Sequence, residues 1–286
     1  MRLTQSALFA LFFLLFQSCG SQITEPEEEE EQSTTPVEAV VSYFVGNSNI
    51  DTSPVGGICL MGGRSEDDQA MRWFLARAQG GDVLVMRASG SNGYQDYFYN
   101  DLGVQLNSVE TLLFRQKHLS NEIIQKIDQA EAIWFAGGDQ GRYLDYWKDN
   151  AIEDALQRAV NRGVVIGGTS AGMAILGEHI WDGNRIQTDF LDIPMLRGIV
   201  TDTHYSERNR SERHRGFVQE IDGRGIAADE YTAICINPDG SVLVFGDPNE
   251  MDQAHFLDTD LNTVIISGDR SGAKRFDLTQ WARIEN

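Results

Sequence analysis

Continuous apolar runs alternate with amphipathic stretches from about residue 40 onward, and this alternation limits the possible folds most. The predicted strands are residues 58–61, 82–86, 108–114, 132–135, 164–166 and 198–201. The predicted helices between them are residues 67–78, 120–130, 140–149, 152–162 and 206–221. Strands that are apolar throughout are buried on both faces. We therefore expect an α/β fold in which helices cover both faces of a mostly parallel sheet.

The C-terminal part of the chain has a different pattern. Short apolar runs at residues 233–236, 241–245, 264–267 and 274–278 are joined by turn sequences such as Asn-Pro-Asp-Gly. Short runs joined by tight turns are typical of antiparallel strands. We expect such strands to be appended to the sheet, and residues 40–286 to form one domain, because no linker-like segment interrupts them.

The first 19 residues have the features of an export signal. Arg2 precedes an almost unbroken apolar run over residues 7–16, which is too short for a comfortable membrane span. Residues 15–19, Leu-Phe-Gln-Ser-Cys, resemble a bacterial lipobox, so Cys19 is the predicted lipidation site. An ordinary signal peptide cleaved nearby is the alternative. We expect an exported protein, a lipoprotein of the bacterial envelope in the periplasm or at the cell surface.

The segment over residues 20–39 is strongly acidic, with seven glutamates between positions 25 and 38. It has almost nothing to bury, and we predict a disordered tether. The whole chain has a formal net charge of −20. Because an acidic surface repels nucleic acid, we exclude a nucleic-acid partner. The only membrane contact that we expect is the lipid anchor.

The sequence Gly168-Thr169-Ser170-Ala171-Gly172 separates a predicted strand from an apolar stretch. A strand, Gly-x-Ser-x-Gly and a helix in this order form the context of a nucleophile elbow. Glycines allow the sharp turn, and N–H groups at the start of the helix stabilise an oxyanion. Ser170 is the candidate nucleophile, and Ala171 N–H is the first oxyanion donor. A plain strand-to-helix turn is the alternative.

A second glycine turn, Gly137-Gly138, follows the strand predicted over residues 132–135. Ligands bind where the C-terminal ends of parallel strands gather, so this turn can face Ser170. We predict that Gly138 N–H is the second oxyanion donor. The turn lacks Gly-x-x-x-x-Gly-Lys, and Asp139 would repel phosphate, which excludes a phosphate-binding loop.

A serine nucleophile needs a base held by a carboxylate. Of the five histidines, His204 follows the strand-like run 198–203, so it emerges at a strand end and is the candidate base. Three carboxylates stay open as its partner: Asp182, Asp202 and Glu230. No His-Glu-x-x-His sequence is present, and we predict no metal site.

Three arginines follow His204 at the start of a predicted helix for which Ser206 is the N-cap: Arg208, Arg210 and Arg213. Cations at a helix N-terminus oppose its dipole, so stability does not explain them. Guanidinium groups bind carboxylates, which predicts a carboxylate-rich substrate. The alternative is salt bridges with Glu207, Glu212 and Glu220.

Four motifs in this order resemble the cyanophycinase and aspartyl dipeptidase family of serine peptidases. They are Phe-x-Gly-Gly-Asp-Gln (135–140), Gly-Gly-Thr-Ser-Ala-Gly (167–172), Asp-Thr-His-Tyr-Ser-Glu-Arg-Asn-Arg-x-x-Arg (202–213) and Gly-Ile-Ala-Ala-Asp-Glu-Tyr-Thr-Ala (225–233). The resemblance covers about residues 55–245. It implies a flavodoxin-like fold, related to class I glutamine amidotransferases, and an enzyme without a cofactor.

By position, Ser170 resembles the family's nucleophile, His204 its base and Glu230 its acid. The residues that resemble the lining of the β-aspartyl-arginine pocket are Gln140, Asp202, Arg208, Arg210 and Arg213. Thr203 and Tyr205 stand where the family usually has Gln and Phe. Together with the predicted export signal, the resemblance implies an exported serine exopeptidase that hydrolyses aspartyl bonds of the β-Asp-Arg type through an acyl-enzyme. Its substrate would be a peptide or a cyanophycin-like polymer, and a homodimer stays open.

Three other functions stay open. The first is an aspartyl or isoaspartyl dipeptidase that acts on short peptides. The second is an α/β-hydrolase esterase, in which Asp229 and His255 would be the acid and the base. The third is a surface-binding lipoprotein without activity.

Two cysteines, Cys59 and Cys235, lie in strand-like apolar runs. We predict buried, inert thiols. A disulfide between them stays open for an exported protein.

Overall fold

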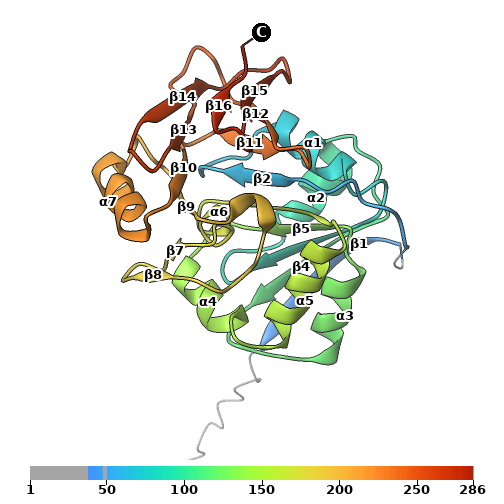
Figure 1. Cartoon of the computed structure of the whole chain (residues 1–286). Coiled ribbons are helices and arrows are strands. Elements are labelled where there is room, and N and C mark those ends of the chain that lie inside the picture. The colour runs from blue at the N-terminus through green and yellow to red at the C-terminus, as the bar shows by residue number, and fades with distance from the viewer. Residues whose placement is uncertain (1–37, 48–49, 286) are drawn as a thin grey trace, which may run out of the picture. The chain divides into compact units, whose positions relative to one another are not determined.

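A ten-stranded sheet runs through the centre of the molecule (Figure 1). The structure is a computed structural model that describes residues 38–47 and 50–285. In spatial order, the strands are β1 (Val40–Gly46), β4 (Ser108–Phe114), β3 (Asp82–Arg87), β5 (Ala132–Phe135), β6 (Val165–Thr169), β2 (Ile58–Met61), β11 (Ala233–Ile236), β12 (Ser241–Phe245), β15 (Lys274–Asp277) and β16 (Ala282–Arg283).

The five central strands, from β4 to β2, are parallel to one another. Both edges of this parallel centre continue with antiparallel strands, β1 beyond β4 and β11 beyond β2. The prediction of a parallel sheet extended by antiparallel C-terminal strands is therefore confirmed for residues 233–236, 241–245 and 274–278. It is wrong for residues 264–267, which join a second sheet.

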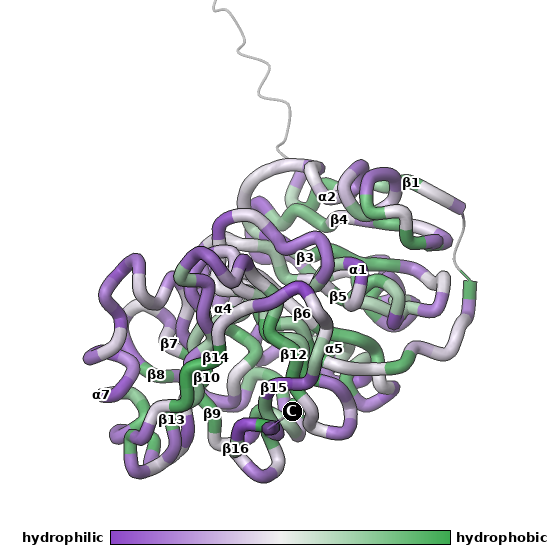
Figure 2. Tube along the Cα trace, turned by 90° about the horizontal axis from the view of Figure 1, so that it is seen from above, coloured by the Kyte–Doolittle hydropathy of each residue, from purple (hydrophilic) through white to green (hydrophobic). Residues whose placement is uncertain are grey.

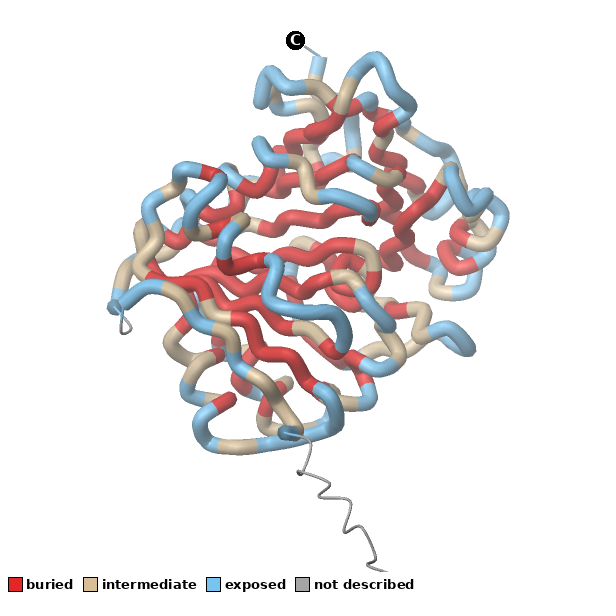
Figure 3. Tube along the Cα trace, turned by 180° about the vertical axis from the view of Figure 1, so that it is seen from behind, coloured by how far each residue is buried: buried red, intermediate tan, exposed pale blue. Residues whose placement is uncertain are grey.

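Side chains of the parallel strands alternate between two hydrophobic cores. In β2, Ile58 and Leu60 point into one core, and Cys59 and Met61 into the other. The central strands are buried (Figure 3), and apolar residues concentrate along them (Figure 2). Because each face must be covered, helices pack on both sides, as predicted.

One face is covered by α3 (Asn121–Gln129), α4 (Gln140–Trp147), α5 (Ala151–Asn161) and α6 (Ala171–Ala174). The other face is covered by α1 (Asp68–Ala76), α2 (Tyr94–Asp96) and the π-helix η1 (Tyr97–Asp101). The helices α1, α3, α4 and α5 begin after side-chain caps; for example, Asp67 accepts hydrogen bonds from the N–H groups of Gln69 and Ala70.

A second sheet of four strands lies beside the first and has the order β14-β13-β10-β9. Its strands are β14 (Thr263–Ser267), β13 (Gln253–Leu257), β10 (Arg224–Ala228) and β9 (Ile199–Asp202). The expectation that residues 198–201 join the parallel sheet is thus wrong. The strand β9 is parallel, but it pairs with β10, whose other edge is taken by β13.

The helix predicted over residues 206–221 begins later, as α7 (Ser211–Ile221), and Ser206 is not its N-cap. Residues 205–209 form a turn in which Asn209 has a φ of 50°. The remaining elements are the hairpin β7 (Ile180–Trp181) and β8 (Ile186–Gln187) and the 3-10 turn η2 (Pro194–Leu196).

The predicted leader, the lipidation site Cys19 and all of the acidic tether except its last two residues lie outside the described part of the chain. Within the described part, none of the helices has the length and apolar character needed to cross a membrane.

Candidate active site

Ser170 lies between the end of β6 and the start of α6, in a strained backbone conformation with φ 52° and ψ −113°. Its N–H donates to the carbonyl oxygen of Met61 at 3.0 Å. A Cβ on Gly172 would lie 1.9 Å from the carbonyl oxygen of Phe135, and one on Gly168 would meet Gly172 at 2.5 Å. The flanking glycines are therefore required by close packing, and the turn holds Ser170 in a conformation that few side chains adopt.

A continuous hydrogen-bonded chain links Ser170, His204 and Glu230. Ser170 Oγ lies 2.8 Å from His204 Nε2, and His204 Nδ1 lies 2.7 Å from Glu230 Oε1. The ring of His204 is buried. It emerges just beyond β9, whereas Glu230 follows β10, so the smaller sheet supplies both partners of the serine.

The other two carboxylates that the sequence left open do not contact the imidazole. Asp182 instead closes the β7–β8 hairpin and accepts from the N–H groups of Asn184 and Arg185. Asp202 binds Arg210 Nη1 at 3.1 Å and also pairs with Arg213. Glu230 is therefore the carboxylate that orients the base.

The electrostatic environment keeps the imidazole neutral and the carboxylate ionised. Burial lowers the pKa of His204, opposed by its bond to Glu230 and reinforced by the charges of Arg208 and Arg210. Burial raises the pKa of Glu230, but the hydrogen bonds from Arg64 and His204 outweigh this and hold it below its usual range. A neutral imidazole can accept a proton from Ser170, as a general base must.

Two backbone N–H groups near Ser170 are free to stabilise an anion. Within the described residues, the amides of Ala171 and Gly138 donate to no other protein group. Both residues line the same cavity as Ser170. Stabilisation of an oxyanion requires free N–H donors of this kind beside a nucleophile.

That cavity, of about 120 Å³, contains all five residues predicted to bind substrate: Gln140, Asp202, Arg208, Arg210 and Arg213. Gln140 donates to the carbonyl oxygen of Trp181 at 3.1 Å. Arg210 also donates to the carbonyl oxygen of Thr203 at 2.7 Å. Arg210 and Arg213 are therefore held by Asp202 and backbone groups at the cavity wall, and in the described part of the chain neither forms a salt bridge with Glu207, Glu212 or Glu220.

Arg208 differs from the other two arginines. Its side chain is exposed, and in the described part of the chain it has no carboxylate within 4 Å. Arg210 and Arg213, by contrast, share Asp202. Arg208 is thus the cation of this cavity that remains available for an acidic group of a ligand.

Comparison with known proteins places this site in a family. The model of Peptidase family S51 matches residues 62–244, which include Ser170, His204 and Glu230. The chain belongs to peptidase family S51. It is therefore a hydrolase, a serine-type peptidase of the cyanophycinase and peptidase E group.

Individual relatives agree with this membership. A cyanophycinase of Synechococcus elongatus is 27% identical over 235 residues, which are 72% of this chain and 73% of the relative. Uncharacterized peptidase YgaJ of Bacillus subtilis is 26% identical over 192 residues, 66% of this chain and 74% of the relative. The crystal structure of a peptidase from an acI-B1 Actinobacterium has the same fold, with a TM-score of 0.61 at 16% identity, covering 76% of this chain and 96% of that one.

One segment of this S51 peptidase contacts all three members of the hydrogen-bonded chain and was not identified from the sequence. Met61 accepts from Ser170 N–H, as described above, and Gly62 accepts from His204 N–H at 2.8 Å. Arg64 Nε donates to Glu230 Oε2 at 2.7 Å. A Cβ on Gly63 would lie 2.3 Å from the His204 ring. The sequence contains a signal that could have identified this segment: the apolar run 58–61 is followed by two glycines, Gly62 and Gly63, as at residues 137–138.

The esterase alternative predicted that Asp229 and His255 act together as the acid and the base. The two residues do contact each other, but they do not contact Ser170. His255 Nε2 lies 3.2 Å from Asp229 Oδ2, and both side chains are buried. Asp229 also accepts from Ser206 N–H. Through Asp229, the pair stabilises the turn that follows His204. The histidine that is hydrogen-bonded to Ser170 Oγ is His204.

The cysteines Cys59 and Cys235 are directly opposite each other on β2 and β11, with 3.6 Å between their sulfur atoms. Both are free thiols and fully buried, in agreement with the prediction. Burial raises the pKa of Cys235 well above its usual range, which keeps this thiol protonated and unreactive.

Proposed function

We propose that this S51 peptidase is an exported enzyme that hydrolyses aspartyl peptide bonds of the β-Asp-Arg type through an acyl-enzyme. The observation that carries the proposal is the chain of hydrogen bonds from Ser170 through His204 to Glu230, at 2.8 and 2.7 Å. The strained turn that presents Ser170 and the two free N–H groups beside it support the same chemistry.

In the first half of the reaction, Ser170 Oγ attacks the carbonyl carbon while His204 Nε2 takes its proton. The N–H groups of Ala171 and Gly138 stabilise the negative oxygen of the tetrahedral intermediate. Glu230 stabilises the imidazolium and keeps the ring oriented. His204 then gives the proton to the leaving nitrogen, and the C–N bond breaks.

In the second half, His204 accepts a proton from a water molecule, which attacks the ester carbon of the acyl-enzyme. The new tetrahedral intermediate uses the same two N–H donors. Its collapse returns the proton to Ser170 Oγ and releases the new carboxylic acid. The proton transfers thus use Ser170, His204 and Glu230, which are already linked by hydrogen bonds.

The substrate assignment is supported by the charges around the smaller cavity. Arg208 offers an unpaired guanidinium to a carboxylate of the aspartyl residue. Asp202, buried between Arg210 and Arg213, fixes these two guanidinium groups at the cavity wall. Relatives that share this region are named cyanophycinases.

The decisive test is Ser170→Ala, assayed on cyanophycin, on β-Asp-Arg peptides and on α-aspartyl peptides. Loss of a serine nucleophile typically lowers kcat by on the order of 10⁶. Ser53→Ala, at an exposed serine that lines neither cavity beside Ser170, serves as the matched control. Wild-type turnover by Ser170→Ala would refute the mechanism.

An aspartyl or isoaspartyl dipeptidase is the nearest alternative, because the same triad and cavity would serve it. The substrates separate the two. Release of dipeptides from the polymer supports cyanophycinase activity, whereas hydrolysis of short aspartyl peptides alone supports a dipeptidase.

Export is proposed from residues 1–19 alone. Metabolic labelling with palmitate and fractionation of the producing bacterium test it, with Cys19→Ser as the variant that should lose the label. Unlabelled protein in the cytoplasmic fraction would contradict the proposal.

A further inference from the structure

Ser170 also borders a second, larger cavity, whose lining does not include Arg208, Arg210 or Arg213. This cavity, of about 650 Å³, is lined by Ser170 and His204 and by the acidic and aromatic side chains Glu66, Asp68, Tyr94 and Tyr97. Arg64 and Arg87 also line it, but Arg64 is paired with Glu230 and Arg87 donates to backbone carbonyl oxygens. If the aspartyl part of the substrate lies beside Arg208, the leaving part must extend to the opposite side of Ser170. The larger cavity is therefore the place for the leaving residue.

Glu66 is a half-buried carboxylate at the wall of this cavity and has no cationic partner. Tyr94 donates its hydroxyl to Glu66 Oε1, and in the described part of the chain no basic nitrogen lies within 4 Å of the carboxylate. Arg87, which faces it from the end of β3, donates instead to the carbonyl oxygens of Ser89 and Ser91. The Glu66 carboxylate is thus open to a cation from outside.

The burial of Glu66 makes such a cation favourable. Burial raises its pKa, and the Tyr94 hydrogen bond and the distant charge of Arg87 offset this only in part. A carboxylate away from water is costly to ionise unless an opposite charge accompanies it. A guanidinium or ammonium group in the cavity would supply that charge.

The wall next to Glu66 suits the rest of a basic side chain. Tyr97 donates its hydroxyl to Asp68 Oδ1 at 2.9 Å, so its ring is fixed at the cavity wall. Asp68 is itself paired with Arg72 at 3.4 Å, in an exposed contact. Aromatic rings pack well against the alkyl stems of lysine and arginine and attract their charges.

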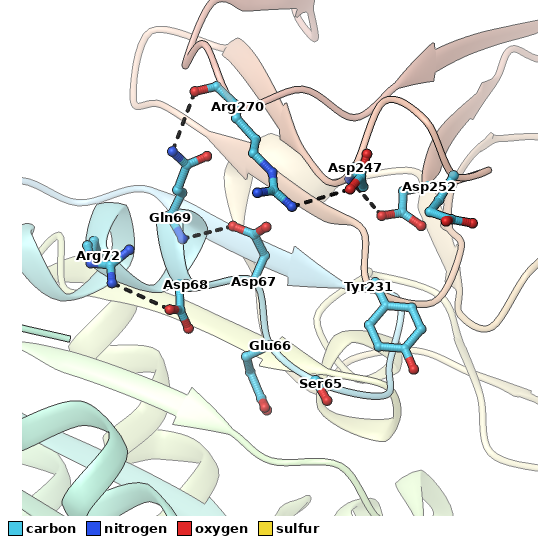
Figure 4. A pocket seen from close by; sticks show the side chains of 11 residues that line it. Ser65, Glu66, Asp67, Asp68, Gln69, Arg72, Tyr231, Asp247, Asp252 and Arg270 are labelled. Carbon is cyan, nitrogen blue, oxygen red and sulfur yellow. Dashed lines mark hydrogen bonds and ion pairs between the residues drawn. The ribbon is translucent and has the colours of Figure 1, made fainter. Parts of the chain in front are cut away.

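The charge of the adjoining surface points in the same direction. Glu66 and Asp68 also line a neighbouring cavity of about 540 Å³, in which the carboxylates of Asp67, Asp247, Glu250 and Asp252 outnumber the two arginines (Figure 4). A concave surface with an excess of one charge attracts the opposite charge. This part of the cleft should therefore disfavour acidic leaving residues.

We propose that the Glu66 side of the cleft binds the leaving part of the substrate and prefers a leaving residue with a cationic side chain, which pairs with Glu66. The inference rests on the proposed function, because a leaving residue exists only if Ser170 attacks an aspartyl bond. It concerns the part of the cleft that Arg208, Arg210 and Arg213 do not line.

The test uses aspartyl peptides that differ only in the residue whose amine leaves: Arg, Lys, Leu or Glu. The wild type should hydrolyse the Arg and Lys peptides with a kcat/KM at least about tenfold above that of the Leu peptide, and the Glu peptide most slowly. In Glu66→Gln the ratio of Lys to Leu should fall to near one. Glutamine keeps an oxygen for the Tyr94 hydroxyl, so the loop retains its packing.

Glu250→Gln is the matched control, since this exposed carboxylate lines the neighbouring cavity but not the one that contains Ser170. It should keep the wild-type ratio. Equal kcat/KM for the Lys and Leu peptides in the wild type, or an unchanged ratio in Glu66→Gln, overturns the inference while the proposed function stands. If no aspartyl peptide is hydrolysed, the proposed function fails, and the inference fails with it.

Discussion

The nucleophile and its base stand on different sheets. Ser170 follows β6, in the middle of the ten-stranded sheet, whereas His204 and Glu230 follow β9 and β10 of the four-stranded one. The larger sheet fixes the serine through a strained turn between packed glycines. The smaller sheet fixes the imidazole by hydrogen bonds between side chains. The segment from Met61 to Arg64 contacts Ser170, His204 and Glu230 and so connects the two sheets at the site. We call this segment and its contacts the seam, and the alignment of the catalytic groups depends on it.

Among the variants that test this comparison, the one with the largest expected effect tests the contribution of the smaller sheet. Glu230→Gln keeps the size of the side chain but removes the charge that stabilises the imidazolium, so kcat should fall by about 10⁴. Steady-state kinetics measure the fall, and thermal unfolding should show an intact protein. Asp182→Asn, in the β7–β8 hairpin, should retain activity; a larger loss there than in Glu230→Gln would reassign the acid.

Acid should loosen the smaller sheet before the larger one. His214 is fully buried beside Asp202, Arg213 and His255, its ring nitrogens have no hydrogen-bond partner within the described residues, and burial lowers its pKa to about 4. The unfolded state binds the extra proton between pH 6.5 and 4. The contribution of His214 to the free energy of unfolding should therefore fall by up to about 3 kcal/mol across that window and change no further below it.

Hydrogen exchange at pH 7 and pH 5 measures this difference strand by strand. The strands β9, β10 and β13 should lose protection at pH 5 while β3, β5 and β6 keep theirs. His214→Phe, which cannot take up a proton, should remove the acid sensitivity. Equal loss of protection in both sheets would show that the smaller sheet is not more sensitive to acid than the larger one.

The seam itself is tested by Gly63→Ala. Gly63 has a φ of 126°, and a Cβ there would lie 2.3 Å from His204 Cε1. The ring must shift, and a displacement of about 1 Å at a catalytic group can lower activity by about 10². Gly216→Ala, in α7 where a Cβ meets nothing within 4 Å, is the control. Similar kcat values for both variants would show that the seam tolerates movement.

The smallest effect concerns substrate contacts near the seam. Arg208→Met should lower kcat/KM by about two- to fivefold for peptides with a free carboxylate on the aspartyl residue, since one exposed ion pair is lost. The corresponding amide substrate should not distinguish the variant from the wild type. Arg115→Met, an exposed arginine that lines neither cavity beside Ser170, is the control. A general loss on both substrates would mean that Arg208 has a structural role.

The strands of the parallel centre could be predicted because burial on both faces makes them apolar at every position. Residues 58–61, 108–114 and 132–135 match the observed strands. The edge strand β1 was missed, since its residues are only half-buried or exposed. That β9 leaves the parallel sheet could not be predicted, because its pairing with β10 depends on β13, whose glutamine and histidine obscure the strand pattern.

The site was predictable where glycines mark a turn after a strand, as at Ser170 and Gly138. The partner of His204 was not. Alternation along a strand would place Asp202 and His204 on the same face. His204, however, lies beyond the strand at a φ of 46°, so this rule no longer applies to it, and its ring meets Glu230. A positive φ at a residue other than glycine could not be predicted from the amino-acid sequence here.

The conformation of Ser170 has a consequence for directed evolution. A φ of 52° with a ψ of −113° is open to glycine but costs other residues about 1–3 kcal/mol. Ser170→Gly should therefore raise the melting temperature while it abolishes turnover. A library of this peptidase that is selected for heat resistance alone would accumulate inactive variants at this position, so selection must include turnover from the first round.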